Sequence, residues 1–294
     1  AIDSDLIDFE AIISTSKDQI ALAPGYPIKE WEENNRRYFQ YKTGNKIKFV
    51  MGFNSGRFEV KKEKYKGVDL EVYHHKSHTY NLDEMINGLK AALDYNTKHF
   101  SPYQHRQARI IEFPDSEGSY ATTMANSIPM SEIRFIANTN TAAEKVDLAF
   151  YVAAHELTHQ WWGNQVAGAD ALGARMLSES ITEHITLNIY RERYGEEVAL
   201  QFLKKQRERY LKGRRSEQGK EPPLGLAGEQ LYLFYGKGAM AFNTMAHYLG
   251  EKNLNRVLKE FLEDYRLQDE PPYPTSLDLI ERLKEATPDS LLKL

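Results

Sequence analysis

The interpretation of this sequence rests first on one segment, Val152-Ala153-Ala154-His155-Glu156-Leu157-Thr158-His159-Gln160-Trp161-Trp162. On a helix, residues four positions apart share one face about 6 Å apart along the axis, so His155 and His159 are spaced to bind one metal ion. Glu156 points beside such an ion, where its carboxylate can take a proton from an attacking water. The simpler alternative is a helix with two incidental histidines, but the alanines and apolar residues around the segment favour a helix in either case.

A catalytic zinc ion uses three protein ligands and keeps one position open. The next predicted helix supplies two carboxylates one turn apart, Glu179 and Glu183, and either is a candidate third ligand. Farther along, Tyr235 stands where another helix is predicted to begin, and a hydroxyl there is suited to donate to a developing oxyanion. Considered alone, Tyr235 is one of 18 tyrosines, for which a packing role is the commoner interpretation.

The amino-acid composition further limits the functions and the metal sites that are possible. The 294 residues include 38 Lys and Arg against 42 Asp and Glu, and the resulting net charge of −4 argues against a nucleic-acid binder with a basic surface. Because the chain has no cysteine, disulfides, Cys-ligated zinc, iron–sulfur clusters and cysteine nucleophiles are excluded, and a metal site must use histidine and carboxylate. No stretch reaches the roughly 18 apolar residues of a membrane helix. Because the sequence starts at Ala1 and stops at Leu294 soon after a helical pattern, we expect a processed chain or a fragment of a longer one.

The residue patterns predict strands first and helices later. Alternation predicts antiparallel strands at 7–13, 37–41, 46–53, 57–62 and 68–73. A helix is predicted over 81–100, and two more strands over 108–113 and 133–137. Further helices are predicted near 143–162, 177–194, 196–212, 235–249, 252–266 and 275–286.

Three segments, in this order, strongly resemble the M1 metallopeptidases, the gluzincin aminopeptidase family. They are His155 to Asn164, similar to the zinc-helix signature; Leu177-Ser178-Glu179-Ser180, similar to the Leu-Asn-Glu-Gly segment; and Tyr235-Gly236-Lys237-Gly238, similar to the Tyr-Glu-Lys-Gly segment. The resemblance implies that His155, His159 and Glu179 bind one Zn²⁺. It also implies that Glu156 is the general base, that Tyr235 stabilises the tetrahedral intermediate, and that peptides are the substrates.

The spacing of the third ligand departs from the family. The connection from His159 to Glu179 is one residue longer than usual, which a loop containing Gly168 and Gly173 can absorb. Glu183 therefore stays an alternative ligand, although the Leu-Ser-Glu match favours Glu179.

A second departure concerns the substrate's amino group. Aminopeptidases of the family bind this group with the glutamate of a Gly-x-Met-Glu-Asn motif, whereas the corresponding segment here is Met124-Ala125-Asn126. A methyl group cannot pair with an ammonium ion, so Met124, Ala125 and Asn126 are substrate-binding candidates without the usual amine anchor. Strict aminopeptidase specificity is therefore open.

The predicted fold class is α+β, a thermolysin-like zinc peptidase domain with a small sheet plus helices. An N-terminal antiparallel β segment is expected over 1–78, a catalytic α/β part over 79–194, and a helical part over 195–294. The pair Trp161-Trp162, the alanine-bearing loop and the stretch Pro271 to Ser276 are similar to M1-like domains fused to bacterial ABC-transporter permeases. That similarity implies a membrane-anchored parent of this otherwise soluble piece.

Three functions are compatible with these residues. The first is an aminopeptidase-like M1 enzyme with an altered amine anchor. The second is an endopeptidase or oligopeptidase with the same zinc chemistry. The third is a weakly active peptide-binding module tethered to a transporter. Because the set His155, Glu156, His159, Glu179 and Tyr235 is intact, an enzyme is favoured.

The remaining histidines are not assigned a role. His74, His75 and His78 lie at a predicted strand end, where an exposed polar turn is a commoner interpretation than a metal site. No partner spacing or helix face supports a site at the others, which are His99, His105, His184 and His247.

Overall fold

The computed structural model describes residues 5–137 and 147–292. Contacts along the chain divide it into two compact units. The sheet unit comprises residues 5–93 and 103–160, and the helical unit comprises 94–102 together with the described residues after 160.

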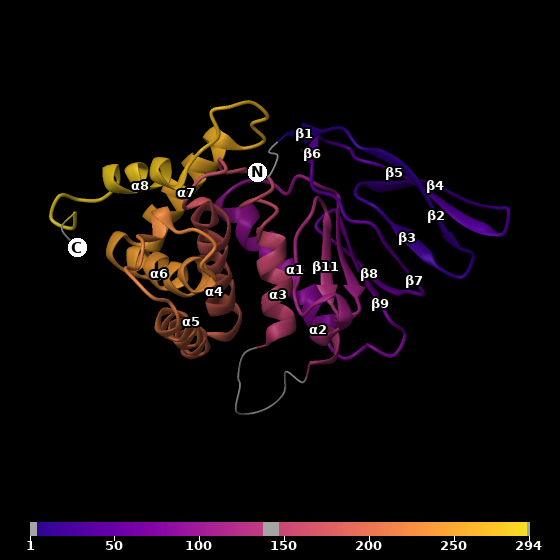
Figure 1. The fold of residues 1–294 in the computed structure, drawn as a ribbon, viewed down its shortest axis with the longest axis horizontal. Helices are drawn as coiled ribbons and strands as arrows, with labels where there is room; N and C mark the ends of the chain where they lie inside the picture. The colour runs from indigo at the N-terminus through magenta and orange to yellow at the C-terminus, as the bar shows by residue number, and fades with distance from the viewer. Residues whose placement is uncertain (1–4, 138–146, 293–294) are drawn as a thin grey trace. The chain divides into compact units, whose positions relative to one another are not determined.

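The N-terminal part of the sheet unit consists of short antiparallel sheets (Figure 1). The three-stranded sheet has the order β2 (Glu10–Ser16), β5 (Arg36–Lys42), β4 (Tyr26–Glu33). Two further sheets have two strands each. In one of them β1 (Leu6–Ile7) pairs with β6 (Ile47–Lys48), and in the other β3 (Ile20–Leu22) pairs with β7 (Asn54–Gly56). Of the strand expected over 46–53, only the two residues of β6 are present, because Phe49 and Phe53 are exposed and do not form a buried face. Most of β4 is also exposed, so alternation does not reveal it.

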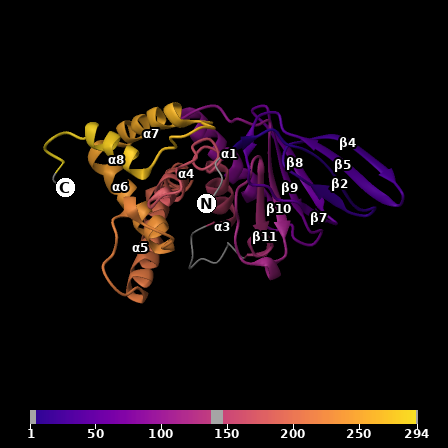
Figure 2. The same ribbon diagram turned by 45° about the horizontal axis from the view of Figure 1, so that its top comes forward.

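A four-stranded sheet forms the core of the sheet unit, with the order β11-β10-β9-β8 (Figure 2). β8 (Glu59–Tyr65) and β9 (Val68–His74) are an antiparallel hairpin, whereas β9, β10 (Gln107–Phe113) and β11 (Ser127–Ser131) run parallel. Every residue of β10 and β11 is buried, as is usual for parallel strands with covered faces. The carboxyl ends of β9, β10 and β11 therefore meet at one edge of the sheet.

Helices complete the sheet unit. They are the first part of α1 (Leu82–His99), the 3₁₀ turn η1 (Asp115–Glu117), α2 (Ile133–Ile136) and α3 (Leu148–Thr158). The strand predicted over 133–137 is wrong, because the chain turns into α2 directly after β11. The side-chain amide of Asn81 donates to the carbonyls of residues 134, 135 and 137, which satisfies acceptors at the end of this short helix. The helix predicted over 143–162 is present as α3, and its residues 143–146 lie outside the described residues.

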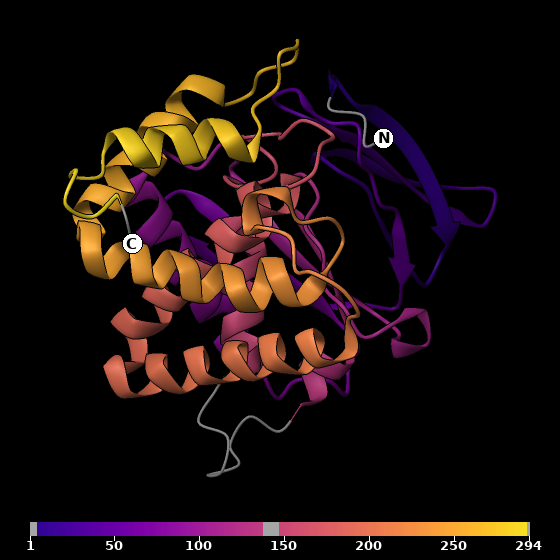
Figure 3. The ribbon, with the colours of Figure 1, turned by 60° about the vertical axis from the view of Figure 1, so that its left-hand side comes forward.

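The helical unit follows the predicted order of helices. Its elements are the π-turn η2 (Met176–Ser180), α4 (Ile181–Tyr194), α5 (Glu196–Ser216), the 3₁₀ turn η3 (Leu224–Leu226), the π-turn η4 (Tyr232–Lys237), α6 (Gly238–Leu249), α7 (Glu251–Tyr265) and α8 (Ser276–Glu285). The stretch η4–α6 lies alongside α5 (Figure 3). Thr275 begins α8 with a capping box, in which its hydroxyl and the Asp278 carboxylate satisfy each other's backbone N–H groups.

The predicted α+β class is confirmed, with antiparallel strands at the N-terminal end and helices at the C-terminal end. Among the described residues, the longest helices are too polar to cross a bilayer.

Candidate active site

Helix α3 carries the two candidate metal-binding histidines. The Asp147 side chain caps the helix by accepting from the backbone N–H of Phe150 at 3.0 Å. Gly88 of α1 permits a close approach, since a Cβ there would lie 2.5 Å from the carbonyl oxygen of Phe150 and 3.0 Å from the Cβ of Ala153. The helix that bears the motif is therefore fixed from its first turn and packed directly against α1.

The rings of His155 and His159 face each other across one helical turn. Their Nε2 atoms are 3.1 Å apart, and the side chains are only 5% and 9% exposed. Two ligands at 2.0–2.1 Å from a tetrahedral zinc ion have nitrogens about 3.3 Å apart. The observed separation is close to that value, so this pair of imidazoles fits a shared metal ion.

Glu156 is buried beside the histidines and contacts a residue that sequence reasoning did not single out. The hydroxyl of Thr123 lies 2.7 Å from Oε2 of Glu156 and 2.6 Å from the Glu156 carbonyl oxygen. A hydroxyl in this position can donate to the carboxylate and hold its orientation. The position of Thr123, immediately before Met124, was the only available signal, because the contact joins residues 33 positions apart.

The segment Met124-Ala125-Asn126 forms a tight turn next to α3. Met124 and Ser127 exchange two backbone hydrogen bonds of 2.9 and 3.1 Å, and the Met124 carbonyl accepts from the Gln160 side chain at 2.8 Å. Asn126 has a φ of 50° and is 2% exposed. Its amide oxygen accepts from the N–H of Gly25 at 3.3 Å, so this side chain holds the turn in place. Ala125 is also buried.

In the helical unit, Glu179 and Tyr235 lie on the π-turns η2 and η4. Such turns are rare, and they occur frequently at functional sites. The buried hydroxyl of Ser180 donates to the carbonyl of Phe234 at 2.7 Å, which joins the two turns next to these residues. Glu179 is 9% exposed.

Two further contacts distinguish the candidates in the helical unit. The Arg209 guanidinium lies 4.2 Å from the centroid of the Tyr235 ring, a cation–π contact that restrains the phenol. Glu183, the alternative ligand, accepts from the Gln206 side chain of α5 at 3.0 Å. Glu183 thus has a structural role in joining α4 to α5.

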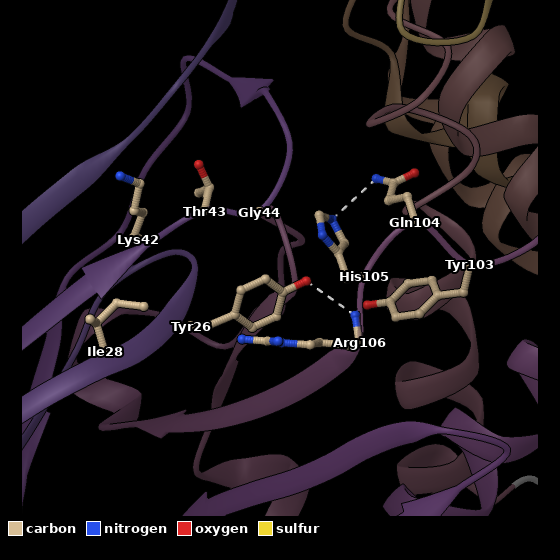
Figure 4. Close-up of a pocket in the computed structure, with 9 residues that line it drawn as sticks. All are labelled: Tyr26, Ile28, Lys42, Thr43, Gly44, Tyr103, Gln104, His105 and Arg106. Carbon is tan, nitrogen blue, oxygen red and sulfur yellow. Dashed lines mark hydrogen bonds between the residues drawn. The ribbon is translucent and has the colours of Figure 1, made fainter.

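The sheet unit also has a cavity of about 460 Å³ that contains none of the predicted site residues (Figure 4). Arg106 stacks on the Tyr26 ring at 4.2 Å, and its N–H donates to the Tyr26 hydroxyl at 3.1 Å. Burial, assisted by the charge of Arg109, lowers the pKa of His105 to about 4. The ring is therefore neutral at neutral pH, when its Nε2 can accept from the Gln104 amide nitrogen 3.3 Å away.

Comparisons with known proteins identify a family, two relatives and a solved structure that this chain resembles. A model of the peptidase family M1 domain matches residues 84–294. Two proteins named tricorn protease-interacting factor F2, from Thermoplasma volcanium and Thermoplasma acidophilum, are each 22% identical, over 87% and 88% of this chain and 33% and 34% of theirs. The chain thus spans about a third of the length of these curated relatives.

Among solved structures, an M1 zinc metallopeptidase from Deinococcus radiodurans matches with a TM-score of 0.72 at 19% identity. The match covers 97% of this chain and 62% of that chain. At this identity the likeness shows a shared fold.

Proposed function

This chain belongs to peptidase family M1, and from that membership we propose that it hydrolyses peptide bonds with one zinc ion held by His155, His159 and Glu179. The observation that carries the proposal is the 3.1 Å separation of the two imidazole Nε2 atoms on α3. Two imidazole nitrogens at this distance share either the proton of one neutral ring or a metal ion, and membership of a metallopeptidase family together with the Glu156 carboxylate next to the pair supports the metal ion.

The choice of Glu179 as third ligand is supported by residue type and local structure. Two imidazoles and one carboxylate, the set that His155, His159 and Glu179 offer, are a common ligand set of catalytic zinc. Glu179 lies on a π-turn in the Leu-Ser-Glu segment, whereas Glu183 is hydrogen-bonded to Gln206. We therefore assign the ligand role to Glu179.

When bound, the zinc ion supplies a Lewis acid that polarises the scissile carbonyl and lowers the pKa of water. Glu156 takes the proton of the attacking water and later passes it to the leaving amine. The hydroxyl of Thr123, 2.7 Å from Oε2, holds the carboxylate in one orientation during both transfers. Tyr235 donates a hydrogen bond to the oxyanion that develops on the carbonyl.

The proposed substrate selection differs from that of the family's aminopeptidases. The buried methyl group of Ala125 supplies no charge for a free α-amino group, so amine recognition through this position is absent. The relatives named as protease-interacting factors support peptides as the substrate class. We propose peptide hydrolysis that depends less on a free N-terminus than the action of a family aminopeptidase does.

The test is a peptide library with free and N-acetylated ends, assayed with zinc, after chelation, and after zinc is restored. We expect cleavage that chelation abolishes and zinc restores, with similar rates for free and blocked peptides. Cleavage of free peptides alone would show that another group binds the amine. If no peptide is cleaved by the zinc-loaded protein, the alternative of a weakly active peptide-binding module replaces the enzyme.

Fusion to a transporter permease in the parent chain stays a proposal that rests on sequence resemblance alone. Its support is the combination of Trp161-Trp162, Ala125 and the stretch Pro271 to Ser276. The test is the length and membrane association of the polypeptide in the source cells. A short polypeptide in the soluble fraction contradicts it.

A further inference from the structure

A second group of metal-ligating side chains lies at the carboxyl edge of the central sheet, within the sheet unit. It consists of His78, Glu112 and Glu132, whose ligand atoms all lie within 4.8 Å of one another. None of these residues belongs to the peptidase motifs on α3, η2 and η4.

The three residues come together because three parallel strands end at the same edge (Figure 2). His78 lies in the turn after β9, Glu112 is the penultimate residue of β10, and Glu132 directly follows β11. The register pairs Glu112 with Met130 and Phe113 with Ser131, so the chain places Glu132 one step beyond the end of β10. Crevices at the carboxyl ends of parallel strands are the usual place for ligands in sheets of this kind.

The two carboxylates of this group lack a lysine or arginine partner among the described residues. Glu112 is only 6% exposed. Within the described residues, neither Glu112 nor Glu132 forms an ion pair with a lysine or an arginine, even though Arg134 is close to Glu132 in the sequence. The backbone N–H of Asp115 donates to Oε1 of Glu132 at 2.9 Å and fixes the position of this carboxylate. Two carboxylates this close repel one another unless a cation lies between them.

The imidazole of His78 faces one of these carboxylates. Nδ1 of His78 is in direct contact with Oε1 of Glu112, while Oε2 of Glu112 accepts from the N–H of His75 at 2.6 Å. An unprotonated ring nitrogen and a carboxylate oxygen are both electron-pair donors. Their contact therefore requires either a proton on Nδ1 or a metal ion bound by both groups.

We propose that His78, Glu112 and Glu132 bind a divalent first-row transition cation of the Zn²⁺ class. One imidazole and two carboxylates match the preference of Zn²⁺, whereas Mg²⁺ and Ca²⁺ prefer oxygen ligands throughout. The His78 side chain is 20% exposed and Glu132 is half-buried, so water can reach the ion and complete its coordination. The ion ties the turn after β9 to the ends of β10 and β11, which makes it a site separate from peptide hydrolysis.

The experiment measures bound zinc by mass spectrometry after saturation with Zn²⁺ and removal of the excess. The variants are His78→Asn and Glu132→Gln, and His155→Ala is measured beside them to empty the proposed site on α3. His75→Asn is the matched control for packing, because the His75 ring lies 4.9 Å from the His78 ring and contacts Ser77 but is not in the group. Circular dichroism confirms that each protein is folded, and the half-buried Glu132 gives a second variant if His78→Asn does not fold.

We expect two zinc equivalents in the unmodified protein and in His75→Asn, and one in His78→Asn, Glu132→Gln and His155→Ala. The zinc kept by His155→Ala should disappear when His78→Asn is added. The proposal is overturned if His78→Asn and Glu132→Gln keep as much zinc as the unmodified protein, which would show that His78 and Glu112 are joined by a hydrogen bond alone. That outcome leaves the peptidase proposal intact, because the zinc on α3 is scored separately by His155→Ala.

Discussion

Gly238 lies against Ser180, the residue that follows the candidate ligand Glu179. The substitution Gly238→Ala therefore tests how tightly the residues around Glu179 are packed. Its φ of −56° and ψ of −52° are helical, so glycine is needed there only for space. A Cβ at this position would lie 2.3 Å from Oγ and 2.6 Å from Cβ of Ser180. Ordinary carbon contacts lie at about 3.5–4.0 Å, and the Cβ of Ser180 cannot rotate away because it is attached to the backbone.

The expected cost follows from these distances. Overpacking in a core costs about 1–3 kcal/mol, and the overlap of more than 1 Å places Gly238→Ala near the upper end. Alanine recovers about 1 kcal/mol of helix propensity, which leaves a net loss of about 2 kcal/mol. Ser180→Gly removes both clashing atoms but leaves the Cα of residue 180 at 3.2 Å, a tight contact that offsets the propensity gain, so in that background the same substitution should be about neutral. The predicted coupling is therefore about 2 kcal/mol.

The assay is guanidinium chloride unfolding of the four proteins of this cycle, compared at constant m. Gly228→Ala is the control, because its nearest neighbour is the flexible side-chain oxygen of Gln230 at 3.3 Å, and it should change the free energy of unfolding by less than about 0.5 kcal/mol. An equal cost of Gly238→Ala in both backgrounds would refute the reasoning. Since Ser180 follows Glu179, we also expect Gly238→Ala to weaken zinc binding.

Three further predictions follow from the sheet unit. The pKa of His105 is lowered by burial from 6.5 to about 4, so the unfolded chain binds more protons between these values and stability falls as pH decreases through that window. The loss reaches up to roughly 3 kcal/mol, and His105→Asn should remove that part of the pH dependence of urea unfolding. Thr123→Val should lower kcat about 10-fold with zinc content unchanged, because the Glu156 carboxylate loses its donor; unchanged kcat would contradict this role. Asn126→Ala should cost about 2–3 kcal/mol in thermal unfolding, since it loses the bonds to Gly25 and retains a positive φ; a loss below about 0.5 kcal/mol would contradict it.

The sequence predicts best those features that are local along the chain. The spacing of His155 and His159 lies within one helical turn, so their shared face on α3 follows from helix geometry alone. Most predicted helices are present because their apolar residues recur at helical intervals, as in α7 with buried Leu254, Leu258 and Phe261.

Features that depend on distant contacts were not predictable in this way. β11 has no alternating pattern, because all five of its residues are buried and one is Pro129. The contact of Thr123 with Glu156 and the convergence of His78 with Glu112 join residues 33 and 34 positions apart. Neither leaves a signal in local spacing. The histidines after β9 looked like an exposed turn because the carboxylates that face His78 come from other strands.

The most direct test of the central claim compares zinc content and peptide hydrolysis of the unmodified protein, Glu156→Gln and His155→Ala. Glu156→Gln is expected to keep the zinc bound at α3 and to lose turnover by at least about 10³-fold, because the general base is gone while the ligands remain. His155→Ala is expected to lose both that zinc and turnover. Hydrolysis that survives Glu156→Gln at the original rate, or an unchanged zinc content in His155→Ala, would contradict the account.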